Sequence, residues 1–259
     1  MRWMLALLFV LAACSQPTER LSAKMPVPQA KPAAAMAKPS WDMRVQGRTV
    51  KVHVVTPKSP GPWPTVMLLH GASGLGRGYM IWPVAKALAD RGVAAAVVQY
   101  FDAMPKQISR KGAVRYFEKR EVQLDMMVEQ LLAQPQVRGP AIGIYGYSLG
   151  GFHGLALAGT DSRVAAVVSL GGGLPRHVPS SNLRQASPAL VVHGKRDRIV
   201  PFSRASETVT AWKRYKRPIR LMGLSRTGHV PRGADRDRVI KASADFLAKE
   251  LVLQLALLR

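Results

Sequence analysis

The sequence predicts an α/β fold in which helices cover both faces of a mostly parallel central sheet of about seven to eight strands. From about residue 41 onward, short apolar runs alternate with longer segments of helical periodicity, as in repeated strand–helix units. The apolar runs are nearly continuous and do not alternate with polar residues, which is typical of strands buried on both faces.

Seven apolar runs are expected to form the strands. They are 50–55, 65–70, 93–100, 141–146, 164–170, 189–194 and 219–224. The first two are joined by a Pro- and Gly-rich turn that is too short to contain a crossover helix, so this pair is predicted to be antiparallel.

Helical patterns fill the intervals between these runs. The predicted helices are 82–92, 116–133, 149–159, 203–214 and 235–250. The first has Pro83 in its first turn and Gly92 at its end, where these residues favour a helix start and stop. The second has four apolar residues on one face: Phe117, Leu124, Val128 and Leu131.

The N-terminal segment has the pattern of a secretory signal. Arg2 is followed by an apolar stretch that is too short to span a bilayer and that ends in Leu-Ala-Ala-Cys at Cys14. This ending resembles the lipobox of bacterial lipoproteins, which implies that Cys14 is lipidated after cleavage. The alternative is an ordinary signal peptide with an incidental cysteine. Because Cys14 is the single cysteine, no intramolecular disulfide can form.

The chain is therefore predicted to have three parts. Residues 1–13 are a lipoprotein signal peptide, 14–40 hold the lipidated cysteine and a Pro/Ala-rich tether, and 41–259 form the catalytic domain. The expected location is the bacterial cell envelope, with the protein lipid-anchored to a membrane. Serine at position 15 favours the outer membrane, by resemblance to the lipoprotein sorting rule.

Composition narrows the classes of partner. A chain of 259 residues, 47% of them hydrophobic, suits one large α/β domain and excludes global disorder. The net charge of +23 has two interpretations. It reflects a surface that is generally rich in Arg and Lys, or it serves to attract the protein to an anionic envelope surface. Nucleic acid is not expected as a partner, because there is no zinc-ligand spacing, helix-turn-helix pattern or basic stretch with interleaved aromatic residues.

One short motif suggests a nucleophile. Gly146-Tyr147-Ser148-Leu149-Gly150 is a G-x-S-x-G sequence directly after an apolar run, although this pattern alone also occurs by chance. Ser148 is either a nucleophile on a strained turn or a structural serine in a Gly-rich turn. The partners that a nucleophile needs decide between these alternatives.

Candidate partners follow other predicted strands, at the edge of the sheet where catalytic groups gather. Asp197 lies in "HGKRDRIVP" and His229 in "RTGHVP", whereas Asp161 and Asp102 are weaker candidates for the acid. Five other histidines compete for the role of base: His53, His70, His153, His177 and His193. Among the six, His229 alone follows the last predicted strand.

These residue types fit acyl transfer. A serine hydroxyl becomes a good nucleophile when an imidazole takes its proton, and a carboxylate on the second ring nitrogen fixes the tautomer. We expect Ser148, His229 and Asp197 to fill these roles. The amides of Leu149 and of Ala72, which follows "HG" in "LLHGASG", are the expected oxyanion donors.

The stretch from about Trp41 to Leu251 resembles an α/β-hydrolase, and most of all the dienelactone hydrolase family. The motifs "LLHGASG", "GYSLGG", "HGKRDRIVP" and "GHV" stand in the family's order. The resemblance implies a single-domain hydrolase without cofactor or metal, acting on small esters or lactones. Two features depart from the narrower family, which has a cysteine nucleophile and arginines that clamp the substrate carboxylate. Position 148 is serine, and "YFDAMP" lacks the arginine expected after the fourth strand, while Arg232 is only a loose match for the other arginine.

The sequence thus predicts a lipid-anchored serine hydrolase that cleaves a carboxylic ester through an acyl-enzyme. The expected partners are a small-molecule ester and, through the anchor, a membrane. Thioesterase and serine peptidase activities are alternatives within the enzyme class. A non-catalytic envelope-binding lipoprotein is the alternative outside it.

Overall fold

The computed structural model describes residues 41–77, 80–104 and 116–257. The predicted signal peptide, the tether and Cys14 lie outside the described residues.

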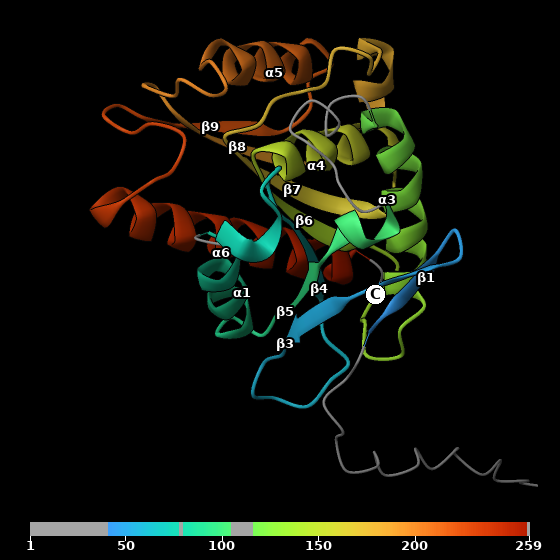
Figure 1. Ribbon diagram of the computed structural model, residues 1–259. Coiled ribbons are helices and arrows are strands. Elements are labelled where there is room, and N and C mark those ends of the chain that lie inside the picture. The colour runs from blue at the N-terminus through green and yellow to red at the C-terminus, as the bar shows by residue number, and fades with distance from the viewer. Residues whose placement is uncertain (1–40, 78–79, 105–115, 258–259) are drawn as a thin grey trace, which may run out of the picture. The chain divides into compact units, whose positions relative to one another are not determined.

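A seven-stranded sheet forms the centre of the described domain, as predicted (Figure 1). Its strands are β3 (Val52–Val55), β4 (Thr65–Leu69), β5 (Ala94–Val98), β6 (Ile142–Tyr147), β7 (Val164–Leu170), β8 (Ala189–Gly194) and β9 (Ile219–Leu224). The spatial order is β3-β5-β4-β6-β7-β8-β9, and every neighbouring pair is parallel except β3 with β5.

The first strand differs from the prediction in its partner. β3 runs antiparallel to the rest, but Val52 pairs with Val98 of β5 and not with β4. Both sides of β4 already carry parallel partners, β5 and β6, so no position beside it is open. The predicted antiparallel direction is therefore confirmed, whereas the predicted neighbour is wrong.

A small hairpin before the sheet was not predicted. β1 (Met43–Val45) pairs antiparallel with β2 (Arg48–Val50), so the predicted strand 50–55 is divided between two sheets. Gln46 and Gly47 connect the two strands with φ values of 48° and 80°. Positive φ at both central residues matches the tight turn that joins twisted antiparallel strands.

The five predicted helices are all present, and they form a layer on each face of the sheet (Figure 1). α1 (Ile81–Ala89) and α6 (Gly233–Ala256) cover one face, and α3 (Phe117–Leu132), α4 (Leu149–Thr160) and α5 (Ser203–Arg214) cover the other. Short 3-10 helices lie at η1 (Gly74–Arg77), η2 (Tyr100–Ala103) and η3 (Ser180–Gln185). α6 extends beyond the predicted 235–250 because Leu251 still packs into the core.

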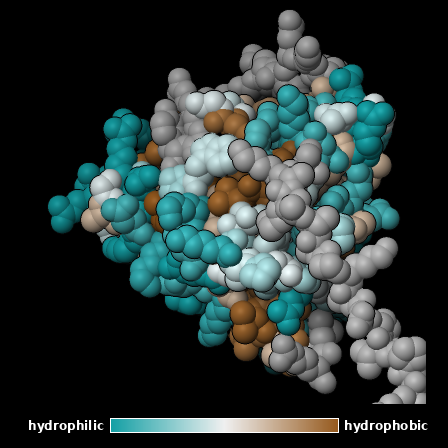
Figure 2. Space-filling model, turned by 90° about the horizontal axis from the view of Figure 1, so that it is seen from below, coloured by the Kyte–Doolittle hydropathy of each residue, from teal (hydrophilic) through white to brown (hydrophobic). Residues whose placement is uncertain are grey.

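Each helical layer encloses its own hydrophobic core against the sheet. Leu124, Leu155 and Trp212 belong to one core, and Leu88 and Leu247 belong to the other. The surface seen in Figure 2 is mostly hydrophilic, with hydrophobic residues in separate patches. Within the described residues, no helix combines the length and apolar character needed to cross a membrane.

The sheet places the predicted functional residues at one edge. β4, β6, β8 and β9 are mutually parallel through the chain of pairs, so their carboxyl ends lie at the same side of the domain. His70 follows β4, Ser148 follows β6, Asp197 follows β8, and His229 follows β9.

Candidate active site

Ser148 occupies a strained turn between β6 and α4. Its φ of 54° and ψ of −116° are unfavourable for a residue with a Cβ, and this strain holds the side chain out of the turn. The amide of Ser148 donates to the carbonyl of Leu170 on the neighbouring strand at 2.7 Å. The turn is therefore anchored to the sheet immediately at the serine.

Two glycines make this turn possible. A Cβ on Gly146 would lie 2.1 Å from the carbonyl oxygen of Gly150, and a Cβ on Gly150 would lie 2.2 Å from the carbonyl oxygen of Leu69. Both separations are far below van der Waals contact, so any side chain would force the backbone apart. The glycine spacing in the motif thus has a steric cause.

His229 lies beside the serine and is oriented toward it. Its Nε2 is 2.9 Å from Ser148 Oγ, and its Nδ1 is 2.7 Å from Asp197 Oδ2. A carboxylate can only accept hydrogen bonds, so Nδ1 carries the proton and Nε2 is free to accept the serine hydroxyl proton. The structure thus brings together the three residues that chain order predicted.

Asp197 is held as a buried acceptor. Its side chain is 0% exposed, whereas the His229 side chain is 14% exposed and can be reached from solvent. The amides of Ile199 and Val200 donate to Asp197 Oδ1 at 2.8 and 2.9 Å. These donors leave Oδ2 directed at the imidazole and compensate the burial of the carboxylate.

A second histidine contacts the same carboxylate. His193 Nε2 donates to the carbonyl of Val200 at 2.9 Å and lies 3.3 Å from Asp197 Oδ2. Its side chain is fully buried, as is that of Asp197. His193 therefore supports the acid, which sequence reasoning did not foresee.

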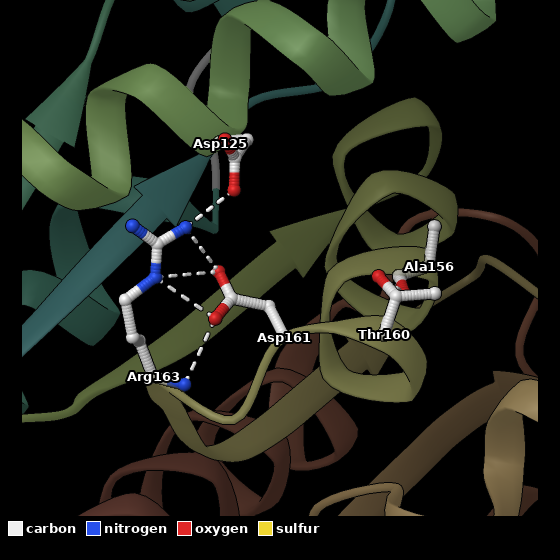
Figure 3. A network of polar contacts seen from close by, with 5 residues as sticks. All are labelled: Asp125, Ala156, Thr160, Asp161 and Arg163. Atoms are coloured by element: carbon white, nitrogen blue, oxygen red, sulfur yellow. Dashed lines mark hydrogen bonds and ion pairs between the residues drawn. The ribbon is translucent and has the colours of Figure 1, made fainter.

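The weaker acid candidates lie elsewhere. Asp161 caps the end of α4 opposite to Ser148, about 18 Å away for a helix of this length. There it binds Arg163, whose Nε is 2.9 Å from Asp161 Oδ1 and which also bridges to Asp125 (Figure 3). Asp102 accepts from the amide of Lys51 at 3.2 Å.

The pocket beside Asp161 is also distant from the serine. It has a volume of about 460 Å³ and is lined by residues of α3, the end of α4 and the following turn, among them Asp125, Thr160 and Arg163. The residues of the network in Figure 3 are among those that line it. It is not continuous with the Ser148 turn, which begins the same helix.

The remaining histidines have other neighbours. His53 is exposed on β3 and contacts Gln99, His153 is buried in α4 and stacks on Phe117, and His177 pairs with Glu121. Burial is the main cause that lowers the pKa of His153 well below its ordinary value, and the charge of Arg120 adds to it. None of these three rings contacts Ser148 in the described structure.

The loop after β4 packs directly against the serine. A Cβ on Gly71 would lie 3.3 Å from Ser148 Cβ, so the following residue, Ala72, lies at the mouth of the turn. The amide of Leu149 is the first of α4, and the amides of a helix's first turn have no acceptor within the helix. The Leu149 amide is therefore adjacent to Ser148, and Gly71, which precedes Ala72, packs against the serine.

Sequence reasoning missed the residues behind this loop. His70 stacks on Tyr100 with ring centroids 4.2 Å apart, and the Arg120 guanidinium lies 4.9 Å from the centre of the Phe101 ring. Arg120 is fully buried in α3. Its sequence signal was an arginine four residues before Leu124, on the apolar face of the predicted helix.

The remaining features of the predicted site are Arg232 and the "YFDAMP" segment. Arg232 is exposed just before α6, and the Arg120 guanidinium lies over the rings of Tyr100 and Phe101, the first two residues of "YFDAMP". In the described parts of the chain, no cluster of three or more His, Cys, Asp or Glu side chains is arranged to hold a metal ion. The chemistry that the arrangement supports is proton transfer from Ser148 to His229, with charge compensation by Asp197.

Comparison with known proteins places these motifs in a family. The sequence profile of the Dienelactone hydrolase family matches residues 50–256. Mouse mitochondrial acyl-coenzyme A thioesterase 2 is 34% identical over 129 residues, which are 49% of this chain and 26% of that protein. The 2,6-dihydropseudooxynicotine hydrolase of Paenarthrobacter nicotinovorans is 32% identical over 131 residues, which are 51% of this chain and 34% of that protein. The chain thus spans about a quarter to a third of the length of these relatives.

Solved structures share the fold. A dienelactone hydrolase-like promiscuous phosphotriesterase from metagenomic libraries superimposes with a TM-score of 0.70 and 22% identity, covering 82% of this chain and 97% of that one. Est1E from Butyrivibrio proteoclasticus gives a TM-score of 0.64 and 19% identity, covering 82% and 99%.

Proposed function

The chain belongs to the dienelactone hydrolase family, and from this premise we propose that it is a serine hydrolase that cleaves a carboxylic ester or lactone. The observation that supports the proposal is the hydrogen-bonded chain from Ser148 through His229 to Asp197, built on a positive-φ turn. Structural serines do not need an imidazole acceptor, a buried carboxylate and a strained backbone together.

The proposed reaction has two halves. Ser148 Oγ attacks the ester carbonyl while its proton passes to His229 Nε2, and Asp197 stabilises the resulting imidazolium. The amides of Leu149 and Ala72 stabilise the tetrahedral oxyanion. His229 then gives its proton to the departing alcohol. In the second half, a water oxygen attacks the acyl carbon while its proton passes to His229, and His229 returns this proton to Ser148 Oγ as the acid leaves.

A thioester is the second candidate substrate. Its support is the similarity to mouse acyl-coenzyme A thioesterase 2, which covers about half of this chain. The same nucleophile, base and oxyanion donors serve both carbonyl types, because oxygen and sulfur differ at the leaving group and not at the attacked carbon. An oxygen ester and a thioester of identical acyl chain distinguish the candidates by their kcat/KM ratio.

A fluorophosphonate probe tests the class of the protein. We expect covalent labelling of wild-type protein at Ser148 and none in the folded Ser148→Ala variant. A non-catalytic binding lipoprotein would leave the probe unreacted, because an unactivated serine hydroxyl is a poor nucleophile. Failure of the wild-type protein to be labelled would overturn the proposal.

We further propose that Cys14 anchors the protein to the bacterial envelope through lipid. The support is the sequence: an apolar stretch ends in Leu-Ala-Ala-Cys and a Pro/Ala-rich segment follows. Wild-type protein is expected to leave the membrane fraction with detergent and not with high salt. Cys14→Ala is expected to change both the mature size and this fractionation, and equal behaviour of the two proteins would contradict the anchor.

An anionic surface is the proposed second contact of the folded domain. Four exposed cations are close in sequence where α5 ends and β9 begins: Lys213, Arg214, Lys216 and Arg220. None of the four forms an ion pair with a described residue, whereas Lys86 pairs with Asp90 and Lys241 pairs with Asp245. Such an unneutralised group attracts anionic lipid headgroups in a salt-dependent manner.

Charge reversal tests this contact. Lys213→Glu with Lys216→Glu is expected to reduce sedimentation with anionic phosphatidylglycerol vesicles at low salt. The control, Lys86→Glu with Lys241→Glu, makes the same change in net charge at another place. Equal losses in the two variants would show that net charge alone is responsible.

A further inference from the structure

A buried stack of rings lies directly behind the loop that carries Ala72. The His70 ring is nearly parallel to the Tyr100 ring, with centroids 4.2 Å apart, and meets Phe101 edge-on at 4.7 Å. The guanidinium of Arg120 lies over Phe101 on the same cluster. His70 is 2% exposed and Tyr100 is 0% exposed, so neither ring can contact substrate directly.

Two hydrogen bonds connect this stack to the loop backbone. The Tyr100 hydroxyl donates to the carbonyl of His70 at 2.6 Å, and His70 Nδ1 donates to the carbonyl of Gly71 at 2.8 Å. The amide of Gly74 also donates to the Gly71 carbonyl at 3.0 Å. Both peptide groups that precede Ala72 are therefore held through their oxygen atoms.

These hydrogen bonds also fix the direction of the Ala72 N–H, because of the geometry of the peptide group. The carbonyl of Gly71 and the N–H of Ala72 belong to one planar trans peptide, in which they point in opposite directions. Because the Gly71 carbonyl is turned toward the His70 ring, the Ala72 N–H points away from that ring. Gly71 itself abuts Ser148, so the orientation of this peptide determines whether its N–H can meet an oxyanion there.

The protonation state of His70 agrees with this arrangement. Burial is the main cause that lowers the pKa of His70 to about 4, the bond to Gly71 opposes this shift, and the charge of Arg120 adds to it. At neutral pH the ring therefore carries one N–H. A carbonyl can only accept, so the single proton is on the Nδ1 atom that faces Gly71.

We propose that Tyr100 is a positioning residue of the oxyanion site, which acts through His70 and Gly71 on the Ala72 amide. The proposal rests on the proposed hydrolase function. Tyr100 holds the His70 carbonyl with its hydroxyl and the His70 ring with its own ring, and so prevents rotation of the following peptide. It touches neither substrate nor the reacting atoms.

The main test compares two buried tyrosines. Tyr100→Phe keeps the stacked ring and removes the hydroxyl, leaving the His70 carbonyl without this donor. Tyr145→Phe is the matched control, because Tyr145 is also 0% exposed and its hydroxyl has no hydrogen-bond partner among the described residues. The two variants remove the same atom from equally buried positions.

The expected result is a selective loss in the chemical step. Removing an oxyanion donor costs about 100- to 1,000-fold in kcat, and misorienting one is expected to cost about 10- to 100-fold. We expect this loss in Tyr100→Phe with little change in KM, whereas Tyr145→Phe stays within about 2-fold of wild type. A boronic acid that forms a tetrahedral adduct with Ser148 should lose affinity by the same factor as kcat/KM, since it requires the same donors.

A second pair of variants covers the case in which Tyr100→Phe does not fold. His70→Asn retains an N–H close to the position of Nδ1, whereas His70→Leu has similar bulk and no donor. We expect the asparagine variant to keep at least about tenfold more of the wild-type kcat than the leucine variant. Equal kcat values in this pair would overturn the proposal.

The outcomes separate the two proposals. A wild-type protein that neither hydrolyses esters nor reacts with fluorophosphonate contradicts the proposed function before any variant is compared. If the wild type is active and Tyr100→Phe matches Tyr145→Phe in kcat and in boronic acid affinity, the positioning role is wrong while the hydrolase function stands. A fall in melting temperature with unchanged kcat likewise assigns Tyr100 to packing alone.

Discussion

The two sides of Ser148 are supported in different ways. On one side, Asp197 and His229 come from the loops after β8 and β9, respectively, and the carboxylate is held by two backbone amides. On the other side, the loop from His70 to Ala72 is held by a stack of buried rings. The first side therefore depends on a compensated buried charge, and the second on the fixed orientation of a neutral peptide.

This difference explains why the two sides leave different traces in the sequence. Proton transfer requires particular side chains, so Ser148, Asp197 and His229 appear as motifs in a fixed order. An oxyanion donor is a backbone N–H that nearly every residue type has, so position 72 carries no chemical signature. The side chains that hold the His70–Ala72 loop are specific, and they come from single residues on η2 and α3.

Ser148→Ala should have the largest effect, because it removes the nucleophilic hydroxyl itself. We expect kcat for ester hydrolysis to fall by about a million-fold, leaving a small residual rate from the oxyanion donors. Steady-state kinetics on a chromogenic ester, with a circular dichroism spectrum of the variant, measures this. Hydrolysis at the wild-type rate by a folded variant would remove Ser148 from the site.

Asp197→Asn should have the next largest effect, and it is confined to the charged side. An amide accepts and donates differently from a carboxylate, so the imidazole takes the wrong tautomer and kcat falls by about 10,000-fold. Asp161→Asn is the matched control, because Asp161 also binds a basic side chain but at the far end of α4. A larger loss in the control would mean that the acid is misidentified.

Most of the fold could be predicted from the sequence because buried parallel strands and their helices have strong periodic signals. The errors concern pairing. The antiparallel direction of β3 followed from its short connection to β4. Its place beside β5 follows from the parallel partners that β4 has on both sides, which is a tertiary property. The β1–β2 hairpin is short, and its two strands have too few residues for a clear alternation.

The site could be predicted in part for the same reason. Chain order placed Ser148, Asp197 and His229 at one edge, and the structure brings them into contact, while their catalytic roles stay predictions. The contact of His193 with Asp197 and that of Tyr100 with His70 join segments through side chains that no motif contains. The sequence contains one indication of these contacts, which is the position of Arg120 on the apolar face of the predicted helix 116–133.

Gly150→Ala should destabilise the domain where the two sides meet. Its Cβ would lie 2.2 Å from the Leu69 carbonyl oxygen and 2.8 Å from that of His70, so the start of α4 and the loop after β4 must separate. We expect the free energy of unfolding to fall by about 3 kcal/mol or more, measured by urea denaturation. Gly76→Ala is the control, because its Cβ would have no neighbour within 4 Å, and an equal loss there would argue against the steric explanation.

The smallest expected effect is on the pH dependence of the free energy of unfolding, and it concerns His70 in the loop after β4. Burial lowers the pKa of His70 to about 4 in the folded protein, compared with an ordinary value of 6.5. The unfolded chain therefore binds more protons than the folded one between these values. His70 stabilises the fold fully above about pH 6.5, and this contribution declines as the pH falls toward about 4.

For His70 this linkage amounts to roughly 2 kcal/mol lost between pH 7 and pH 5. His153, whose pKa burial also lowers, adds a loss of the same sign, so the wild-type slope exceeds this value. His70→Asn removes the contribution of His70 and should flatten the dependence by about 2 kcal/mol, measured by urea denaturation at both pH values. An unchanged slope in His70→Asn would mean that the ring is protonated in the folded protein at pH 5, where the charge of Arg120 and the burial of the stack oppose it.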